Sequence, residues 1–237
     1  SGLFEHFLLE GWKQLLQPHP LFHTKHYLDQ KSELLNADYN PLLHFLRYGH
    51  SENIDPHPLF DVSDYQERYV DLLGAGENTL LHFLQNGLSL QLNPSPYFDV
   101  TFYLSQDGRI LESGANPLEH YVRRGWKEGL EPCPLFNGDH YLKESGQRVL
   151  PGETPMSLML RSAAGNPRGV SNPHILFHVD YYLTQVPPSE PISGGPLFHF
   201  LKLDIDDVRS PCPLFDTDFY CTRYADVRDC MFHPFLH

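Results

Sequence analysis

The sequence is short of basic residues. It has 17 lysines and arginines against 30 aspartates and glutamates, which gives a formal net charge of −13 with neutral histidines. A nucleic-acid interface needs a basic face to neutralise phosphates, and anionic membrane surfaces attract polybasic segments for the same reason. The composition therefore predicts neither a nucleic-acid partner nor docking on an anionic membrane. No apolar run approaches the ~20 residues of a spanning helix, so we predict no membrane span, and the first residues do not read as a signal peptide.

Cysteine is also scarce. Two of the four cysteines, Cys133 and Cys212, occupy the variable middle position of a Pro-x-Pro motif where related segments have His19, His57 or Ser95. A variable position is a poor place for a required disulfide or metal ligand. We therefore expect free cysteines and a reducing compartment.

Motifs that carry chemistry are missing. The sequence has no glycine-rich phosphate loop, no Gly-x-Ser-x-Gly elbow and no Asp-x-Asp-x-Asp-Gly calcium loop. Cys221 and Cys230 have no histidine and aspartate arranged around them in the sequence as a thiol nucleophile requires. We predict that this chain is not an enzyme and carries no cofactor.

What is present is a unit of about 38 residues that recurs along the chain. A Pro-x-Pro-Leu-Phe motif, or a variant of it, places a phenylalanine at six positions spaced by 38, 38, 38, 41 and 38 residues: Phe22, Phe60, Phe98, Phe136, Phe177 and Phe215. An Asn-Pro-Leu-x-His-type motif places a histidine at six positions: His6, His44, His82, His120, His199 and His237. Each histidine after His6 lies 22 residues beyond a motif phenylalanine. Such self-similarity is typical of a stacked repeat array.

Each unit is expected to form two short helices. The first begins at a capping residue such as Asp61, and the second begins at an asparagine followed by proline, as in Asn116-Pro117. The second helix is expected to end in a left-handed glycine five residues after the histidine, at Gly11, Gly49, Gly87 or Gly125. Helices this short need neighbouring units to hold them. We predict an all-α fold, a solenoid-like array of about six short helix-pair repeats over residues 1–237, with the motif phenylalanines buried, Phe60, Phe98, Phe136 and Phe215 among them.

The regularity breaks between residues 145 and 195. Leu158 and Ala163 replace the histidine and the glycine, and Pro187 shortens the next helix. We interpret this stretch as a decayed repeat, with a bend or partner surface as the alternative. Residues 1–144 and 196–237 are the regular parts. Both ends of the chain fall inside the same element of the repeat, as expected of a piece of a longer array.

The unit resembles a bacterial repeat of the form Pro-x-Pro-Leu-Phe-Asp-x-x-x-Tyr-Leu, then Asp-Val, then Asn-Pro-Leu-x-His-Tyr-Leu-x-x-Gly-Trp-x-Glu-Gly-Arg-x-Pro. Residues 116–129 match the second half best, and Phe215-Asp216 with Tyr220 matches the first. Such repeats are appended to glycosyltransferases and rhamnan-type polysaccharide synthesis proteins, and they occur in large secreted surface proteins. The resemblance implies an accessory module in the bacterial cytoplasm, membrane-associated through its parent protein, or alternatively a secreted or cell-surface module. The arginine of the repeat is matched only by Arg209.

Histidines are the residues that could suggest a metal site. Equivalent positions in a stacked array lie roughly 8–10 Å apart or twice that, too far for two of them to share a zinc ion. The cluster of His19, His23 and His26 straddles a proline-rich loop and a helix start. We predict no metal and a structural role for the histidines that recur with the unit, each bonding a loop carbonyl of the next repeat: His44, His82, His120 and His199.

The array and the resemblance together predict a non-catalytic module of a bacterial glycosyltransferase or polysaccharide-assembly protein. It would serve protein–protein interaction or positioning, and its partner would be a protein or a glycan. One alternative is a carbohydrate-binding module using exposed aromatics; another is a cryptic enzyme in the irregular stretch, where four side chains gather: Arg161, Arg168, His174 and His178.

If a ligand binds, we expect it at the loops that follow the second helices. These loops carry Trp12 with Lys13 and Trp126 with Lys127. An aromatic ring beside a cation suits a sugar bearing a carboxylate or phosphate. The alternative is that both indoles fold back over the helix ends.

Overall fold

The computed structural model describes residues 2–49, 51–204 and 206–224, and this part of the chain is helical without a named strand. The predicted all-α class is confirmed. The α-helices are α1 (Leu3–Leu9), α2 (Thr24–Gln30), α3 (Glu33–Asn36), α4 (Pro41–His44), α5 (Val62–Arg68), α6 (Thr79–Asn86), α7 (Val100–Gln106), α8 (Gly108–Ser113), α9 (Pro117–Arg123), α10 (Gly138–Ser145), α11 (Pro155–Gly165), α12 (Val179–Thr184), α13 (Pro196–Leu201) and α14 (Thr217–Arg223). Two 3₁₀ turns, η1 (Gly11–Gln14) and η3 (Gly125–Glu128), and one π turn, η2 (Phe45–Gly49), follow second helices.

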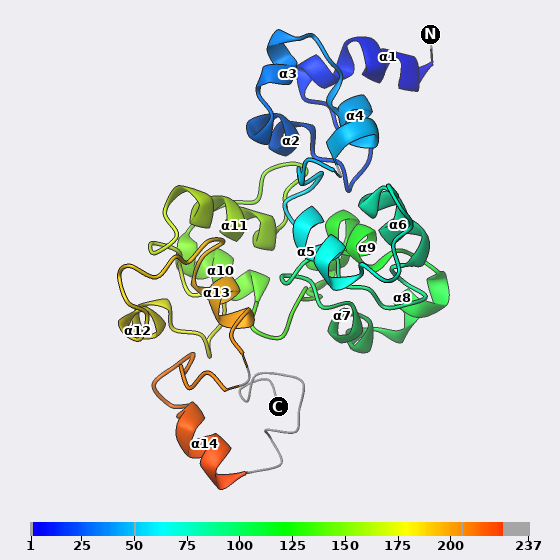
Figure 1. Ribbon diagram of the computed structural model, residues 1–237. Helices are drawn as coiled ribbons and strands as arrows, with labels where there is room; N and C mark the ends of the chain where they lie inside the picture. The colour runs from blue at the N-terminus through cyan, green and yellow to red at the C-terminus, as the bar shows by residue number, and fades with distance from the viewer. Residues whose placement is uncertain (1, 50, 205, 225–237) are drawn as a thin grey trace. The chain divides into compact units, whose positions relative to one another are not determined.

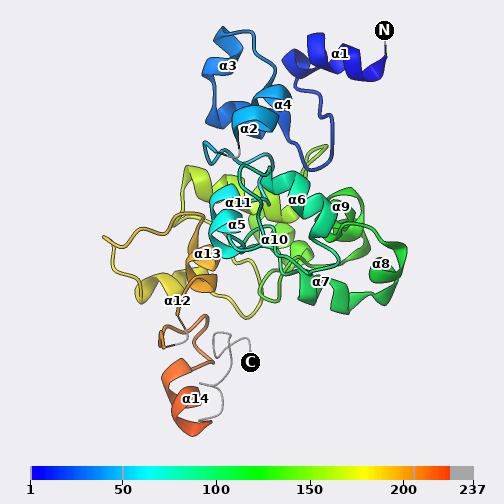
Figure 2. The ribbon, with the colours of Figure 1, turned by 45° about the vertical axis from the view of Figure 1, so that its right-hand side comes forward.

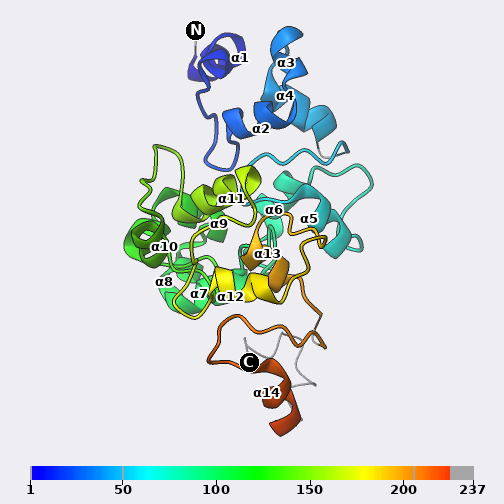
Figure 3. The same ribbon diagram turned by 90° about the vertical axis from the view of Figure 1, so that its left-hand side faces the viewer.

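Helices come in contacting pairs. The first and second helices of a repeat meet in α2 with α4, α5 with α6, α7 with α9, α10 with α11, and α12 with α13. Figure 1 shows these pairs, and the turned views of Figures 2 and 3 keep each pair together. The chain divides into two compact units, residues 1–130 and 131–237. Each described helix is too short or too polar to cross a bilayer.

Polar caps set where the helices begin, as expected. Asp61 and Asp99 accept hydrogen bonds from amides in the first turns of α5 and α7. Asn40, Asn78 and Asn116 cap the second helices α4, α6 and α9 through their side-chain oxygens. The same asparagines also donate a second hydrogen bond, which the spacing of the sequence did not reveal. Their Nδ2 groups donate to carbonyls on the preceding second helix, those of Leu8, Phe45 and Phe83, so each cap also joins successive repeats.

A second link between repeats uses the Pro-x-Pro segment. The amide of the residue that caps a first helix donates to a proline carbonyl of the next repeat, for example Asp61 N to Pro94 O at 3.0 Å. The same bond recurs from His23 to Pro56, from Asn137 to Pro173 and from His178 to Pro211. Proline has no amide hydrogen to offer, but its carbonyl accepts, so this segment ties one first helix to the loop that precedes the next.

The core is aromatic. Phe60 packs against Tyr65 with ring centroids 5.3 Å apart and against Phe83 at 5.6 Å, and all three are buried. The structure also buries the motif phenylalanines Phe22, Phe98, Phe136 and Phe177. Phe215 is only partly buried, against our expectation. For Phe22, Phe60, Phe98 and Phe177, an aromatic residue 23 positions later packs on the motif phenylalanine.

The glycines after the second helices are not left-handed, which corrects our prediction. Gly87 has φ −56°, and none of the described glycines at this position has a positive φ. The left-handed residue comes four positions later, at Leu15, Asn53, Gln91 and Gly129. Gly49 and Gly125 serve a different purpose, which is set by a neighbouring tyrosine, whereas a Cβ on Gly87 would meet Phe83.

Candidate functional site

The recurring histidines bind tyrosines. In four of them, Nδ1 lies within hydrogen-bonding distance of a buried phenol: Tyr27 to His44 and Tyr65 to His82 at 2.8 Å, Tyr103 to His120 at 2.7 Å, and Tyr182 to His199 at 2.6 Å. Each partner comes from the first helix of the same repeat, 17 residues earlier. Our expectation of a contact between repeats through a loop carbonyl is therefore wrong. The constant spacing of 17 was visible in the sequence and could have suggested the pair. His237 lies outside the described residues.

The glycine makes room for the phenol. A Cβ placed on Gly49 would lie 2.5 Å from the Tyr27 hydroxyl, and one on Gly125 would collide with the Tyr103 hydroxyl. Only glycine admits so close an approach. In the repeat of His199 this position is Asp204, and there α13 already ends at Leu201. Tyrosine, histidine and glycine thus act together as a lock that joins the two helices of a repeat.

Burial favours the uncharged forms of the tyrosine and the histidine in this lock. It raises the pKa of Tyr27, Tyr65, Tyr103 and Tyr182 well above the ordinary phenol value. Burial also lowers the pKa of His44 and of His120. The phenol therefore keeps its proton, and its hydrogen bond with Nδ1 joins two uncharged groups. Because a nucleophile needs the opposite, a hydroxyl that gives up its proton to its base, this geometry favours a structural bond.

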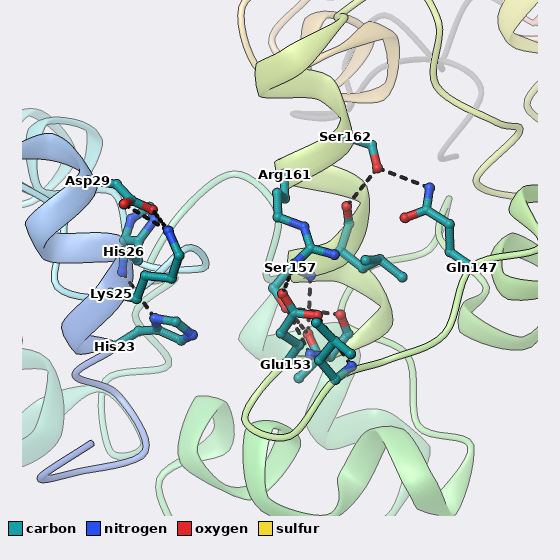
Figure 4. A network of polar contacts seen from close by, with 12 residues as sticks. His23, Lys25, His26, Asp29, Gln147, Glu153, Ser157, Arg161 and Ser162 are labelled. Carbon is teal, nitrogen blue, oxygen red and sulfur yellow. Dashed lines mark hydrogen bonds and ion pairs between the residues drawn. The ribbon is translucent and has the colours of Figure 1, made fainter. Parts of the chain in front are cut away.

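The histidine cluster does not converge on a metal position. His23 Nδ1 accepts the amide of His26, and the His23 ring lies 6.4 Å from the rings of His26 and His57 (Figure 4). In the described residues no three histidines, cysteines or acidic side chains are placed to hold a metal ion. Burial holds the pKa of His57 well below 6.5 and that of His26 at about 4, so these rings are neutral at ordinary pH.

The two tryptophans differ. Trp12 is 2% exposed, so it presents no ring face to a sugar, and the ligand role we expected for Trp12 and Lys13 is wrong. The reason is that η1 folds the indole inward, while Lys13 binds Asp38 at 2.7 Å. Trp126 remains half-buried, with Lys127 Nζ 5.3 Å from the centre of its ring.

The irregular stretch does not gather its charged residues into one site. Arg161 forms a salt bridge with Glu153 (Figure 4), and Arg168 donates to the carbonyls of Pro187 and Glu190. His174 Nδ1 accepts the amide of Leu176 instead. A small recess in this unit is lined mainly by apolar residues: Met159, Ala163, Val170, Val179 and Leu197. None of the four side chains proposed for a cryptic enzyme lines it.

Arg209 is held by acidic partners. It binds Asp207 through Nε and Nη2 and reaches Glu190 Oε1 at 2.8 Å. The same Glu190 oxygen lies 3.0 Å from His199 Nε2. The guanidinium therefore orients the carboxylate that holds the Tyr182–His199 pair, and its charge is already compensated within the repeat.

One feature that sequence reasoning missed is a leucine that stays exposed in successive repeats. It lies seven to nine residues after the core tyrosine, in the segment between the two helices: Leu35, Leu72 and Leu111 in the first unit and Leu150 in the second. Each is about half exposed. Ion pairs stand close by in the chain, Lys31–Glu33 near Leu35 and Arg109–Asp107 near Leu111. We call Leu35, Leu72 and Leu111 the leucine row.

A half-buried hydrogen-bond acceptor recurs before several of the first helices. Asp55 accepts the Val62 amide at 2.8 Å, as the neutral Asn93 does for Val100. Glu131 occupies the same position before α10. Burial outweighs these hydrogen bonds and raises the pKa of both Asp55 and Glu131 to about 7. This position needs a hydrogen-bond acceptor, but a negatively charged carboxylate is unfavourable there.

Asp55→Asn is therefore expected to make the stability of the protein less sensitive to a rise in pH from 4 to 8. A carboxyl whose folded pKa is raised to about 7 from 3.8 stabilises the fold fully below pH 4 and progressively less up to about pH 7. The stability of the variant relative to wild type should grow by about 1–3 kcal/mol between pH 4 and pH 8. Urea unfolding at both values measures this. Asp71→Asn, at an exposed position, is the control. A difference in unfolding free energy between Asp55→Asn and wild type that is the same at pH 4 and pH 8 contradicts the account.

Comparison with protein-family models, curated proteins and solved structures finds no match to this chain.

Proposed function

We propose that the helix pairs stack into a solenoid-like array of about six repeats and that the chain is a non-catalytic interaction module. Its parent would be a bacterial glycosyltransferase or polysaccharide-assembly protein, in the cytoplasm or at the membrane it serves. The partner would be another protein of the same assembly.

The leucine row carries this proposal. An apolar side chain at half exposure in one repeat is ordinary, but the same exposure recurs in three successive repeats of one unit. Apolar points bordered by charges match the composition of protein interfaces, which combine an apolar centre with a polar rim. Exposed leucines repeated along an array let a long partner make several weak contacts at once. After the first contact forms, the others are intramolecular, which raises the overall affinity through effective concentration.

The test replaces Leu35, Leu72 and Leu111 by serine together. Immobilised chain is offered the polysaccharide-assembly proteins of its host, and captured protein is displaced by excess free wild-type chain. The triple variant is expected to displace at least about tenfold less well, since three interface leucines lose their apolar contacts.

A matched control carries the same three changes at exposed leucines outside the row, Leu46, Leu81 and Leu90. It is expected to displace as wild type does. Equal displacement by both triple variants, or no capture that free chain can displace, contradicts the proposal.

Trp126 supports a second candidate, a carbohydrate site. Its indole is half-buried and Lys127 lies over the ring, a pairing that suits an anionic sugar. We expect calorimetric titration with uronic-acid oligosaccharides to give heat with wild type and at least about tenfold weaker binding with Trp126→Ala, because stacking is lost. Identical titrations of the two proteins, or no heat with either, remove this candidate.

A further inference from the structure

The repeat of Phe22 contains an arginine that binds a phenol rather than a carboxylate. Arg47 lies in η2, and its Nη1 donates to the Tyr39 hydroxyl at 3.2 Å. The arginine is exposed, and among the described residues no acidic side chain forms an ion pair with it. Because a phenol is a neutral acceptor, the positive charge of the guanidinium is not compensated there.

The same two positions are filled differently in another repeat. In the register of the unit, Arg47 corresponds to Arg161 and Tyr39 corresponds to Glu153. Arg161 forms a salt bridge with Glu153 (Figure 4). Arg123 is the other arginine at this position, and it binds the glutamate four residues before it at 2.7 Å. Both of these arginines have a carboxylate partner, and in the repeat of Phe22 a tyrosine stands where Glu153 would supply one.

Two tyrosines beside this arginine pack on the same imidazole. The ring centroid of Tyr39 lies 6.0 Å from that of His44, and the ring centroid of Tyr48 lies 5.5 Å from it. Tyr48 remains 48% exposed, and Tyr39 is half-buried. The turn that carries Arg47 and Tyr48 is a π turn, a rare form that is frequent at functional sites. An uncompensated guanidinium therefore lies beside two partly exposed aromatic rings.

We propose that Tyr39, Arg47 and Tyr48 form a binding site for a uronic-acid residue of an acidic polysaccharide. The carboxylate of the sugar binds the guanidinium as Glu153 binds Arg161, because the planar fork of an arginine matches a carboxylate. One face of the sugar ring packs on the exposed Tyr48 ring. A uronic acid carries its carboxylate on the pyranose ring itself, so the charge and a flat face of C–H groups reach the site together.

This site uses neither the leucine row nor Trp126, and the proposal depends on the function of neither. Its affinity is expected to be low, with a dissociation constant on the order of 1 mM, because an exposed ion pair and a single ring face contribute little in water.

The test titrates trigalacturonate into the full chain carrying Trp126→Ala, so that the candidate site at Trp126 does not contribute. NMR of ring-labelled tyrosines follows the signals of Tyr39 and Tyr48, which should shift and saturate together. The ligand control is the fully methyl-esterified trisaccharide, which keeps the sugar rings and loses the charges. It should bind at least about fivefold more weakly, because the charge-assisted bond to the guanidinium is lost.

Two pairs of variants test the role of the arginine. Tyr39→Glu supplies the carboxylate that the other repeat has, so it should bind trigalacturonate at least about fivefold more weakly than Tyr39→Gln, which removes the same ring without adding a charge. Arg47→Gln should weaken binding as methyl esterification does, and Arg148→Gln, at another exposed arginine, should bind as the parent does.

Three results would overturn the proposal. The first is that neither tyrosine signal shifts at about ten times the expected dissociation constant. The second is equal binding of the charged and the esterified trisaccharide, a comparison that leaves the protein unchanged. The third is equal affinity of the Tyr39→Glu and Tyr39→Gln variants.

Discussion

Phe60→Ala is expected to lower the free energy of unfolding by about 3–5 kcal/mol. Phe60 is 1% exposed and touches both Tyr65 and Phe83, so its loss leaves a cavity between the two helices of a repeat and removes contacts on both sides. Urea unfolding followed by circular dichroism measures the change.

The control for this prediction is Phe219→Ala. Phe219 is 66% exposed, so its truncation should cost less than about 0.5 kcal/mol. Similar losses for the two variants would show that the motif phenylalanines are not the core of this fold.

Gly49→Ala is expected to destabilise the chain by about 2–4 kcal/mol. The added Cβ would lie 2.5 Å from the Tyr27 hydroxyl and 2.5 Å from Cδ2 of Phe45. Overpacking of this kind costs about 1–3 kcal/mol, and the displaced phenol loses its bond to His44, worth about 1 kcal/mol. Thermal unfolding is the measurement.

Two further variants test the cause. Gly108→Ala meets no atom within 4 Å and should be neutral or stabilising by up to about 1 kcal/mol. Tyr27→Phe removes the hydroxyl that the methyl group of Gly49→Ala would strike. The variant with both changes should therefore lose less stability than the sum of the losses of the two single variants. Additive losses would mean that the glycine is needed for some reason other than the phenol.

The sequence alone was sufficient for the two main helices of a unit and for the caps at which they begin, but not for α3 and α8 between them. Asp61 and Asn116 start helices where capping chemistry predicts. Repeat spacing also identified Phe60 and His82 as positions that recur along the chain. Period analysis states which residues are equivalent, however, and does not state which residues face each other. The constant spacing of 17 residues was compatible with a bond between Tyr65 and His82, but the structure was needed to show it.

Glycine illustrates a second limit. A glycine in a fixed position indicates either a positive φ or a close approach, and spacing does not separate the two. We chose the first for Gly49 and the structure shows the second. The positive φ is found instead at Leu15, Asn53 and Gln91. Nothing in the sequence indicated a left-handed conformation at these three residues.

Burial of equivalent residues was the least predictable property. Trp12 and Trp126 follow the same glycine position, yet one is buried and the other half-buried. The lysines that follow them also differ, because Lys13 binds Asp38 while Lys127 lies over the Trp126 ring. The leucine row escaped notice because its spacing from the tyrosine varies between seven and eight residues.

The central claim is that the chain binds a protein through the leucine row, and site-specific photo-crosslinking tests it most directly. A crosslinking residue is placed at Leu72, or at the control position Leu81, in the full chain. With the polysaccharide-assembly proteins of the host, we predict a crosslinked partner from position 72 that excess free chain suppresses and the Leu35, Leu72 and Leu111 triple serine variant does not. A partner captured equally from position 81, or capture from position 72 that both competitors suppress alike, would contradict the account.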